Sequence, residues 1–251
     1  RRQRQMCIRD SFTTSGSLAT MYALLLARAF TGRKLVMKVG GGWHGGQPWG
    51  LFGVEYHDEV GWRSGRDETA HFRHPDSEGL PEGLPHEVLV TRFNDLQMLH
   101  EHFRRFGDRL ACFILEPFLG AGGGIPAAGE YLREARALCT KHGVLLVCDE
   151  VIAGFRFQAG LASGLYGVLP DLVTLAKVIG GGMPVAAVAG RREVMELAAR
   201  GASVRFSGGT YSGHPACLAA SAAMLRHLER TGPDLYPALS AMGDRARALI
   251  E

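Results

Sequence analysis

The chain has 251 residues, of which 46% are hydrophobic and 21% charged, so it is long enough to bury a large core as one domain or a domain and a half. A net charge of +3, without a basic tract beyond the first nine residues, gives no electrostatic footprint for nucleic acid. No apolar run approaches the roughly 18 residues that cross a bilayer, and no signal peptide pattern is present, so we expect a cytoplasmic protein without membrane contact.

Apolar strands and amphipathic helices alternate along the chain. A Ser-Gly-Ser turn at residues 15–17 leads into a helix expected over residues 18–30, and the apolar run at 34–39 predicts a strand that ends in three glycines. The polar segment from Trp43 to about Pro85 is too long for a simple connector and is a candidate functional loop. Further strands are predicted at 87–93, 110–117, 144–150, 171–176 and 184–190, and further helices at 95–106, 130–143, 191–201 and 215–230.

Continuous apolar strands separated by amphipathic helices indicate an α/β fold, with a mostly parallel sheet and helices on both faces. Ligands of such sheets bind beyond the carboxyl ends of the strands. The five cysteines lack metal-type spacing and are expected to be reduced thiols, and no metal site is predicted. Candidate functional residues are therefore sought at the strand ends.

Lys177 ends the apolar run at 171–176 and is followed by three glycines and a proline. An ammonium group is costly to bury unless it is paired or loses its proton. One interpretation is a lysine whose amine reaches solvent from the strand end; the other is a desolvated, reactive amine of the kind that forms Schiff bases. The other lysines, Lys34, Lys38 and Lys141, have ordinary surface interpretations.

Three more segments near strand ends carry suggestive residues. Asp149 closes the strand at 144–150, where a turn or capping carboxylate competes with a functional role. Residues 15–17 begin a helix, where free amides and the helix dipole suit a phosphate, although capping by serine explains them equally well. Residues 208–210 form a small polar loop before a helix, with an ordinary turn as the alternative.

Together these segments resemble the class III aminotransferases, which use pyridoxal 5'-phosphate (PLP). The resemblance rests on "DEVIAGFR", "TLAKVIGGGMP" and "SGGTYSGHP", with support from "LARAFTGR" and "GGGWHGG", and runs from about Phe12 to Arg230. It implies the large domain of a fold type I PLP-dependent transferase. It also implies the domain layout: a non-native or disordered leader at 1–11, the PLP-binding large domain at 12–230, and a truncated start of the C-terminal small domain at 231–251.

The resemblance makes Lys177 the Schiff-base lysine and proton carrier, and Asp149 the partner of the PLP pyridine nitrogen. Trp43 takes the place of an aromatic residue stacked on the cofactor ring, and Val151 is expected on the opposite ring face. Thr210 matches a residue that reaches the phosphate of the neighbouring subunit, which implies a homodimer. The complete set of expected cofactor-binding residues is Ser15, Gly16, Ser17, Trp43, His44, Asp149, Val151, Lys177 and Thr210.

The implied reaction is amino-group transfer from an amino acid or amine to a keto acid. The loop after His44 differs from the glycine-, serine- and alanine-rich gating loop of the glutamate-1-semialdehyde 2,1-aminomutases, which favours an aminotransferase. The aminomutase activity is the first alternative, and an inactive fragment of such an enzyme is the second. Arg156 is a candidate for binding a substrate carboxylate, with a structural ion pair as the alternative.

Overall fold

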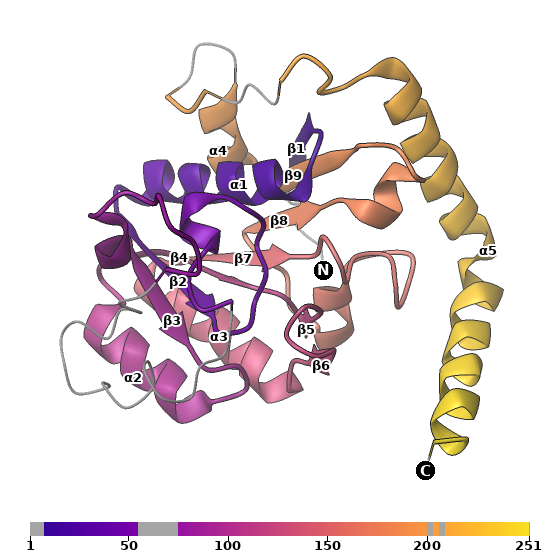
Figure 1. Ribbon diagram of the computed structural model, residues 1–251, viewed down its shortest axis with the longest axis horizontal. Coiled ribbons are helices and arrows are strands. Elements are labelled where there is room, and N and C mark those ends of the chain that lie inside the picture. Colours follow the sequence, from indigo (N-terminus) through magenta and orange to yellow (C-terminus); the bar gives the residue numbers. More distant parts are fainter. Residues whose placement is uncertain (1–7, 55–74, 200–202, 206–208, 251) are drawn as a thin grey trace, which may run out of the picture.

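The computed structural model describes residues 8–54, 75–199, 203–205 and 209–250 (Figure 1). Seven strands form one sheet in the order β1-β9-β8-β7-β4-β2-β3, and only β9 runs antiparallel to its neighbours. The predicted, mostly parallel sheet is therefore confirmed. The strands of this sheet are β1 (Ile8–Thr13), β2 (Leu35–Val39), β3 (Val88–Thr91), β4 (Leu110–Leu115), β7 (Leu145–Asp149), β8 (Leu172–Leu175) and β9 (Ala186–Arg191).

Helices cover both faces of the sheet, as Figure 1 shows. Alternate residues of β4 divide between two cores: Phe113 belongs to the core under α2 and α3, whereas Ile114 belongs to the core under α1. Because neighbouring side chains of a strand point to opposite faces, a strand covered on both sides is apolar along most of its length. The helices are α1 (Gly16–Thr31), α2 (Leu96–Phe106), α3 (Gly129–His142), α4 (Arg192–Met195) and α5 (Pro215–Ala248), and a small hairpin joins β5 (Phe118–Leu119) to β6 (Ile125–Pro126).

The helix ends follow local sequence rules. Ser15 caps α1, and its side chain accepts a hydrogen bond from the Leu18 amide at 3.3 Å. Gly32 and Gly143 end α1 and α3 in the left-handed conformation, with φ values of 68° and 64°. Glycine adopts this conformation without a steric penalty, so the predicted stop of α3 at Gly143 is confirmed.

Two expectations at the ends of the chain differ from the structure. Residues 8–11 were expected in a leader, but they belong to β1 and pair with β9, whose outer edge would otherwise lack backbone partners; residues 1–7 lie outside the described residues. The helix predicted to end at Arg230 continues to Ala248, across the expected domain boundary. Tyr236 attaches this longer helix to the domain, because its hydroxyl donates to the Phe155 carbonyl at 3.0 Å.

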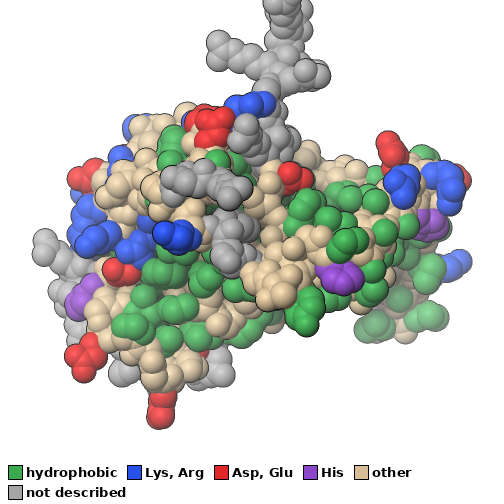
Figure 2. All heavy atoms as spheres, turned by 90° about the horizontal axis from the view of Figure 1, so that it is seen from above, with side chains coloured by type: hydrophobic (Ala, Val, Ile, Leu, Met, Phe, Trp, Pro, Cys, Tyr) green, Lys and Arg blue, Asp and Glu red, His purple; other side chains and the backbone are tan. Residues whose placement is uncertain are grey.

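Helix α5 runs along one side of the molecule, and its C-terminal end points away from the sheet (Figure 1). Hydrophobic side chains are visible on the surface of the molecule on the side where α5 lies (Figure 2). Leu239 and Met242 are exposed on α5, and Tyr211 is exposed just before it. No helix in the described part of the chain combines the length and apolar character needed to cross a membrane.

A pH-dependent contribution to stability is expected from His102 on α2. This side chain is buried, and burial, with a smaller effect of Arg105, lowers its pKa to about 4. The unfolded chain binds a proton near pH 6.5, so the folded state loses stability as the pH falls from about 6.5 toward 4. Between pH 7 and 4.5, we expect urea unfolding to show a loss about 2 kcal/mol larger in wild type than in His102→Leu.

The matched control is Gln97→Leu on the same helix, because Gln97 is exposed and its side chain does not titrate. This variant should keep the wild-type pH dependence. A pH slope in His102→Leu equal to that of wild type would contradict this account, because it would mean that His102 takes up its proton equally in the folded and unfolded states.

Candidate active site

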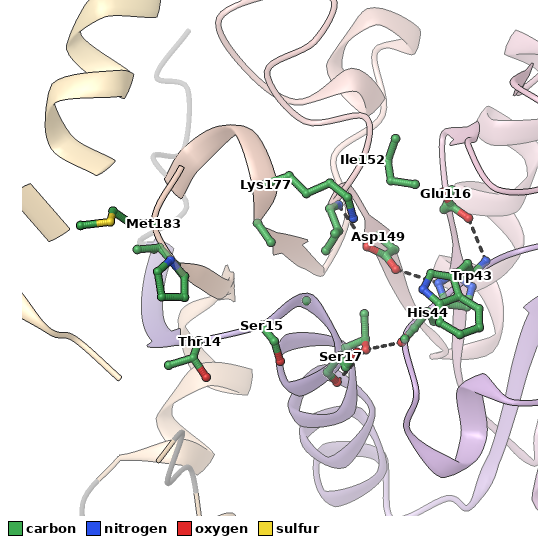
Figure 3. A pocket seen from close by; sticks show the side chains of 17 residues that line it. Thr14, Ser15, Ser17, Trp43, His44, Glu116, Asp149, Ile152, Lys177 and Met183 are labelled. Carbon is green, nitrogen blue, oxygen red and sulfur yellow. Dashed lines mark hydrogen bonds and ion pairs between the residues drawn. The ribbon is translucent and has the colours of Figure 1, made fainter. Parts of the chain in front are cut away.

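A pocket with a volume of about 250 Å³ lies beyond the carboxyl ends of the parallel strands (Figure 3). Its walls come from the N-terminus of α1, the turn after β2 and the segments that follow β4, β7 and β8. Eight of the nine expected binding residues line it, namely Ser15, Gly16, Ser17, Trp43, His44, Asp149, Val151 and Lys177.

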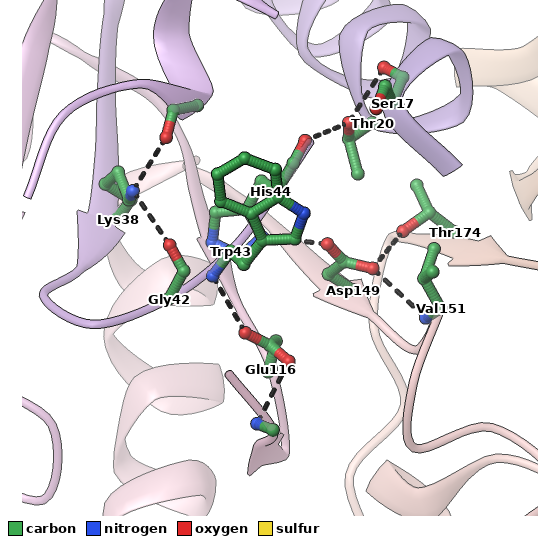
Figure 4. Close-up of polar contacts among 12 residues, drawn as sticks. Ser17, Thr20, Lys38, Gly42, Trp43, His44, Glu116, Asp149, Val151 and Thr174 are labelled. Atoms are coloured by element: carbon green, nitrogen blue, oxygen red, sulfur yellow. Dashed lines mark hydrogen bonds and ion pairs between the residues drawn. The ribbon is translucent and has the colours of Figure 1, made fainter. Parts of the chain in front are cut away.

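Asp149 ends β7 and is only 2% exposed. Its Oδ1 accepts hydrogen bonds from the Val151 amide at 3.1 Å and the Thr174 hydroxyl at 2.9 Å, and its Oδ2 lies 2.8 Å from Nδ1 of His44 (Figure 4). An ionised carboxylate accepts hydrogen bonds but donates none. His44 therefore carries a proton on Nδ1, and three donors fix the carboxylate in one orientation.

His44 is buried between this carboxylate and the start of α1. Its carbonyl accepts a hydrogen bond from the Thr20 hydroxyl at 2.6 Å. Burial lowers the pKa of the imidazole, although the hydrogen bond and charge of Asp149 oppose that shift. The ring is thus neutral at physiological pH, and its buried Nε2 has no hydrogen-bond partner among the described residues.

The N-terminus of α1 closes the pocket opposite Asp149. A Cβ atom at position 16 would lie 3.0 Å from a methyl group of Val151, and one at position 45 would lie 2.6 Å from the Cα of Ser17. Glycine at both positions lets the helix end approach the strand end and the turn. The first-turn amides of a helix lack partners within the helix, and no acidic residue occupies this turn. The helix end therefore suits an anion such as a phosphate.

Lys177 follows β8 in the left-handed conformation, with a φ of 51°. A non-glycine residue adopts this conformation at a cost of about 1 kcal/mol or more, and such strain often marks functional positions. Figure 3 shows its side chain extending along the pocket toward Asp149. The residue is exposed, so the expectation of a desolvated side chain is wrong for this structure, because the pocket is open to solvent.

Two charged residues of the site were not predicted. Lys38 was interpreted as a surface lysine, but it is fully buried within β2. Its burial follows from its place in "LVMKV", because every residue of a strand covered on both faces is enclosed. Glu116 lies just beyond β4 and lines the pocket, and a carboxylate after an apolar strand was the only signal available.

Thr210 and Arg156 lie outside this pocket. Thr210 is exposed in the turn that precedes α5 and is not among the residues lining the pocket. Arg156 is also exposed, and its Nε donates to the Ile152 carbonyl at 2.6 Å. The middle of the candidate loop between Trp43 and Pro85, residues 55–74, lies outside the described residues.

Comparison with known proteins matches residues 8–248 to the family model "Aminotransferase class-III". The glutamate-1-semialdehyde 2,1-aminomutase of Desulforamulus reducens is 40% identical over 238 residues, which cover 94% of this chain and 52% of that protein. The enzyme of the same name from Myxococcus xanthus is 44% identical over 220 residues, covering 87% of this chain and 48% of that protein.

The similar solved structures are also transaminases. An omega-transaminase from Sphaerobacter thermophilus has a TM-score of 0.83 at 31% identity, covering 96% of this chain and 53% of that chain. A structure described as a transaminase with PLP bound has a TM-score of 0.76 at 32% identity, covering 88% and 49%. The chain spans about half the length of the relatives that it matches.

Proposed function

This chain belongs to the class III aminotransferase family, and from that premise we propose that it binds PLP and transfers an amino group from an amino acid or amine to a keto acid. The observation that carries the proposal is the buried carboxylate of Asp149, held by three donors at the floor of a pocket whose rim contains Lys177 and a helix N-terminus. When bound, PLP supplies an aldehyde that condenses with amines and a protonated ring that accepts electrons.

The residues of the pocket fit this cofactor. The Asp149 carboxylate would hold the proton of the ring nitrogen, and the amides and hydroxyls of residues 15–17 would bind the phosphate. Trp43 and Val151 both line the pocket and would enclose the ring. The pocket therefore offers a carboxylate for the ring nitrogen, an anion-binding helix end for the phosphate and an amine for the aldehyde.

Lys177 carries the chemistry that the chain itself supplies. Its Nζ would hold the cofactor at the aldehyde and would carry a proton from and to the substrate carbon. Asp149 would keep the ring nitrogen protonated, and His44 holds Asp149 in place through Nδ1. The strained backbone at Lys177 supports this assignment, because it directs the amine along the pocket.

A homodimer and a cytoplasmic setting belong to the same proposal. Thr210 is exposed outside its own pocket, which supports a role at the phosphate of a second subunit. Exposed apolar residues on and before α5 offer a surface for such a partner. The described cysteines are free thiols, three of them buried, as expected in a reducing compartment. Arg156 is exposed and free to meet a substrate carboxylate if a substrate or second subunit approaches it.

Glutamate-1-semialdehyde 2,1-aminomutase activity is the second candidate, because the similar curated relatives carry that name. The two reactions differ in their need for a second substrate. With PLP present, an aminotransferase turns over only when an amino donor and a keto acid are both supplied. An aminomutase converts glutamate-1-semialdehyde alone. An inactive fragment would do neither, and PLP would remain unattached after borohydride treatment.

Gly45→Ala should weaken PLP binding about tenfold or more. The new Cβ would lie 2.6 Å from the Cα of Ser17, and alanine would be strained at the Gly45 φ of 83°. The turn or the start of α1 must therefore move, which disturbs the phosphate site. Gly46→Ala is the matched control, because a Cβ there meets nothing within 4 Å. Titration with PLP measures both affinities, and equal values would exclude a role for this close approach.

A further inference from the structure

A buried pair of opposite charges lies behind the segment that carries Trp43 and His44. Lys38 of β2 is fully buried, and Glu116 after β4 is 2% exposed. Their strands are parallel neighbours in the sheet, so both residues lie toward the same edge. The reaction steps proposed above use neither side chain.

Lys38 ties the two ends of this segment together. Its Nζ donates to the carbonyls of Gly42 and Gly50, both at 3.0 Å (Figure 4). One ammonium thus closes the turn that contains Trp43 and His44. Burial lowers the pKa of Lys38 to about 8, while the charges of Asp76 and Glu116 oppose that shift, so the ammonium form persists at neutral pH.

Glu116 connects the same segment to the turn after β5. Its Oε1 accepts from the Trp43 amide at 3.0 Å, and its Oε2 accepts from the Gly120 amide at 3.2 Å. Burial, and then the charge of Asp149, raise its pKa to about 7, although the two amides and Lys38 oppose that shift. Glu116 therefore changes protonation close to neutral pH.

We propose that Lys38 and Glu116 are positioning residues that clamp the Trp43–His44 segment and so set the indole and the imidazole relative to Asp149. The clamp acts at three points: the Gly42 and Gly50 carbonyls, held by Lys38, and the Trp43 amide, held by Glu116. The proposal rests on the proposed function, because the clamp serves catalysis only if Trp43 contacts the cofactor.

The clamp loosens as the pH falls through about 7. A protonated Glu116 places a hydrogen on one oxygen, which then accepts poorly from its amide. The charged and titratable groups around Glu116 are Asp149 from β7, Lys38 from β2 and His44 from the segment itself. Lys38 is already protonated below its pKa of about 8, and the lowered pKa of His44 keeps its ring neutral, so Glu116 dominates the change.

Fluorine NMR of protein labelled with 5-fluorotryptophan tests the clamp without cofactor. The chain has three tryptophans, and Trp43→Phe identifies the Trp43 resonance. In wild type, we expect this resonance to shift between pH 6 and 8 with a midpoint near 7. Glu116→Gln should abolish the titration, because the neutral amide does not change protonation. The glutamine has one acceptor oxygen and can accept from only one of the two backbone amides, those of Trp43 and Gly120. PLP affinity at pH 8 should therefore fall about tenfold.

Lys38→Met, which removes both carbonyl contacts, should broaden or move the Trp43 resonance at all pH values and weaken PLP binding. The matched controls are Glu101→Gln and Lys141→Met, because residues 101 and 141 lie on the solvent side of helices α2 and α3. A Trp43 resonance in Glu116→Gln that titrates as in wild type, or is unchanged at pH 8, would overturn the proposal even if Lys38→Met fails to fold. If wild type binds no PLP, the proposed function fails. The Trp43 resonance, measured without cofactor, still shows whether Glu116 and Lys38 position this segment.

Discussion

Lys177→Ala should lower the rate of amino-group transfer by about 10³-fold or more. The variant loses the amine that binds the cofactor and the group that moves the proton at the substrate carbon, and a single positioned acid or base alone contributes about 10²–10⁴-fold. The loss should appear in kcat and persist at saturating substrate. Single-turnover kinetics with a PLP-loaded protein and an amino donor measure it directly.

The same substitution should leave the fold intact. Lys177 is exposed, and alanine meets the same backbone strain at its φ of 51°, so the free energy of unfolding should change by less than about 0.5 kcal/mol. Lys141→Ala, at an exposed lysine near the end of α3, is the matched control and should keep full activity. A Lys177→Ala protein that reacts at the control rate would remove Lys177 from the mechanism.

Asp149→Asn should lower the transfer rate on the order of 10²–10³-fold, the range seen when one electrostatic stabiliser is removed from an active site. The amide keeps the shape of the side chain but cannot hold the ring-nitrogen proton with a negative charge. Its NH₂ group would also face Nδ1 of His44, which must then become an acceptor and move its proton to Nε2. Both changes should lower the affinity for PLP, and the loss of the negative charge should also disfavour the protonated ring that accepts electrons.

Thr174→Val separates charge from orientation. It removes one of the three donors to Asp149 but leaves the carboxylate ionised, so we expect a loss of about tenfold or less. Rates and PLP affinities of the two variants should be compared with wild type at one pH. Equal losses in Asp149→Asn and Thr174→Val would show that orientation, and not the charge of Asp149, limits the reaction.

The sequence predicted the sheet, its helical cover and the family, and all three are confirmed. Local rules were sufficient for the start of α1 at its serine cap and the end of α3 at Gly143. The extension of α5 was missed because Pro233 and Pro237 argue against a continuous helix. Tertiary contacts hold α5 against the domain: Cys217 and Leu225 pack on an apolar cluster, and Tyr236 bonds to Phe155, which no local pattern reveals.

The sequence predicted the residues that line the pocket but missed the two buried residues that support them. Residues at strand and helix ends, such as Asp149 and Ser15, stand out because polar groups follow apolar runs. Lys38 and Glu116 did not, since their roles depend on carbonyls and amides that only the folded turn brings within hydrogen-bonding distance. The exposure of Lys177 was also not predictable, because it depends on how far the pocket opens to solvent.

The most direct test of the central claim is borohydride treatment of the purified chain mixed with PLP, followed by peptide mass spectrometry. We predict that the cofactor becomes fixed to one peptide, at Lys177, with loss of the visible absorbance band, and that Lys177→Ala retains no fixed cofactor. Attachment at another lysine, such as Lys38 or Lys141, or equal labelling of wild type and Lys177→Ala, would contradict the assignment of this pocket as a PLP site built around Lys177.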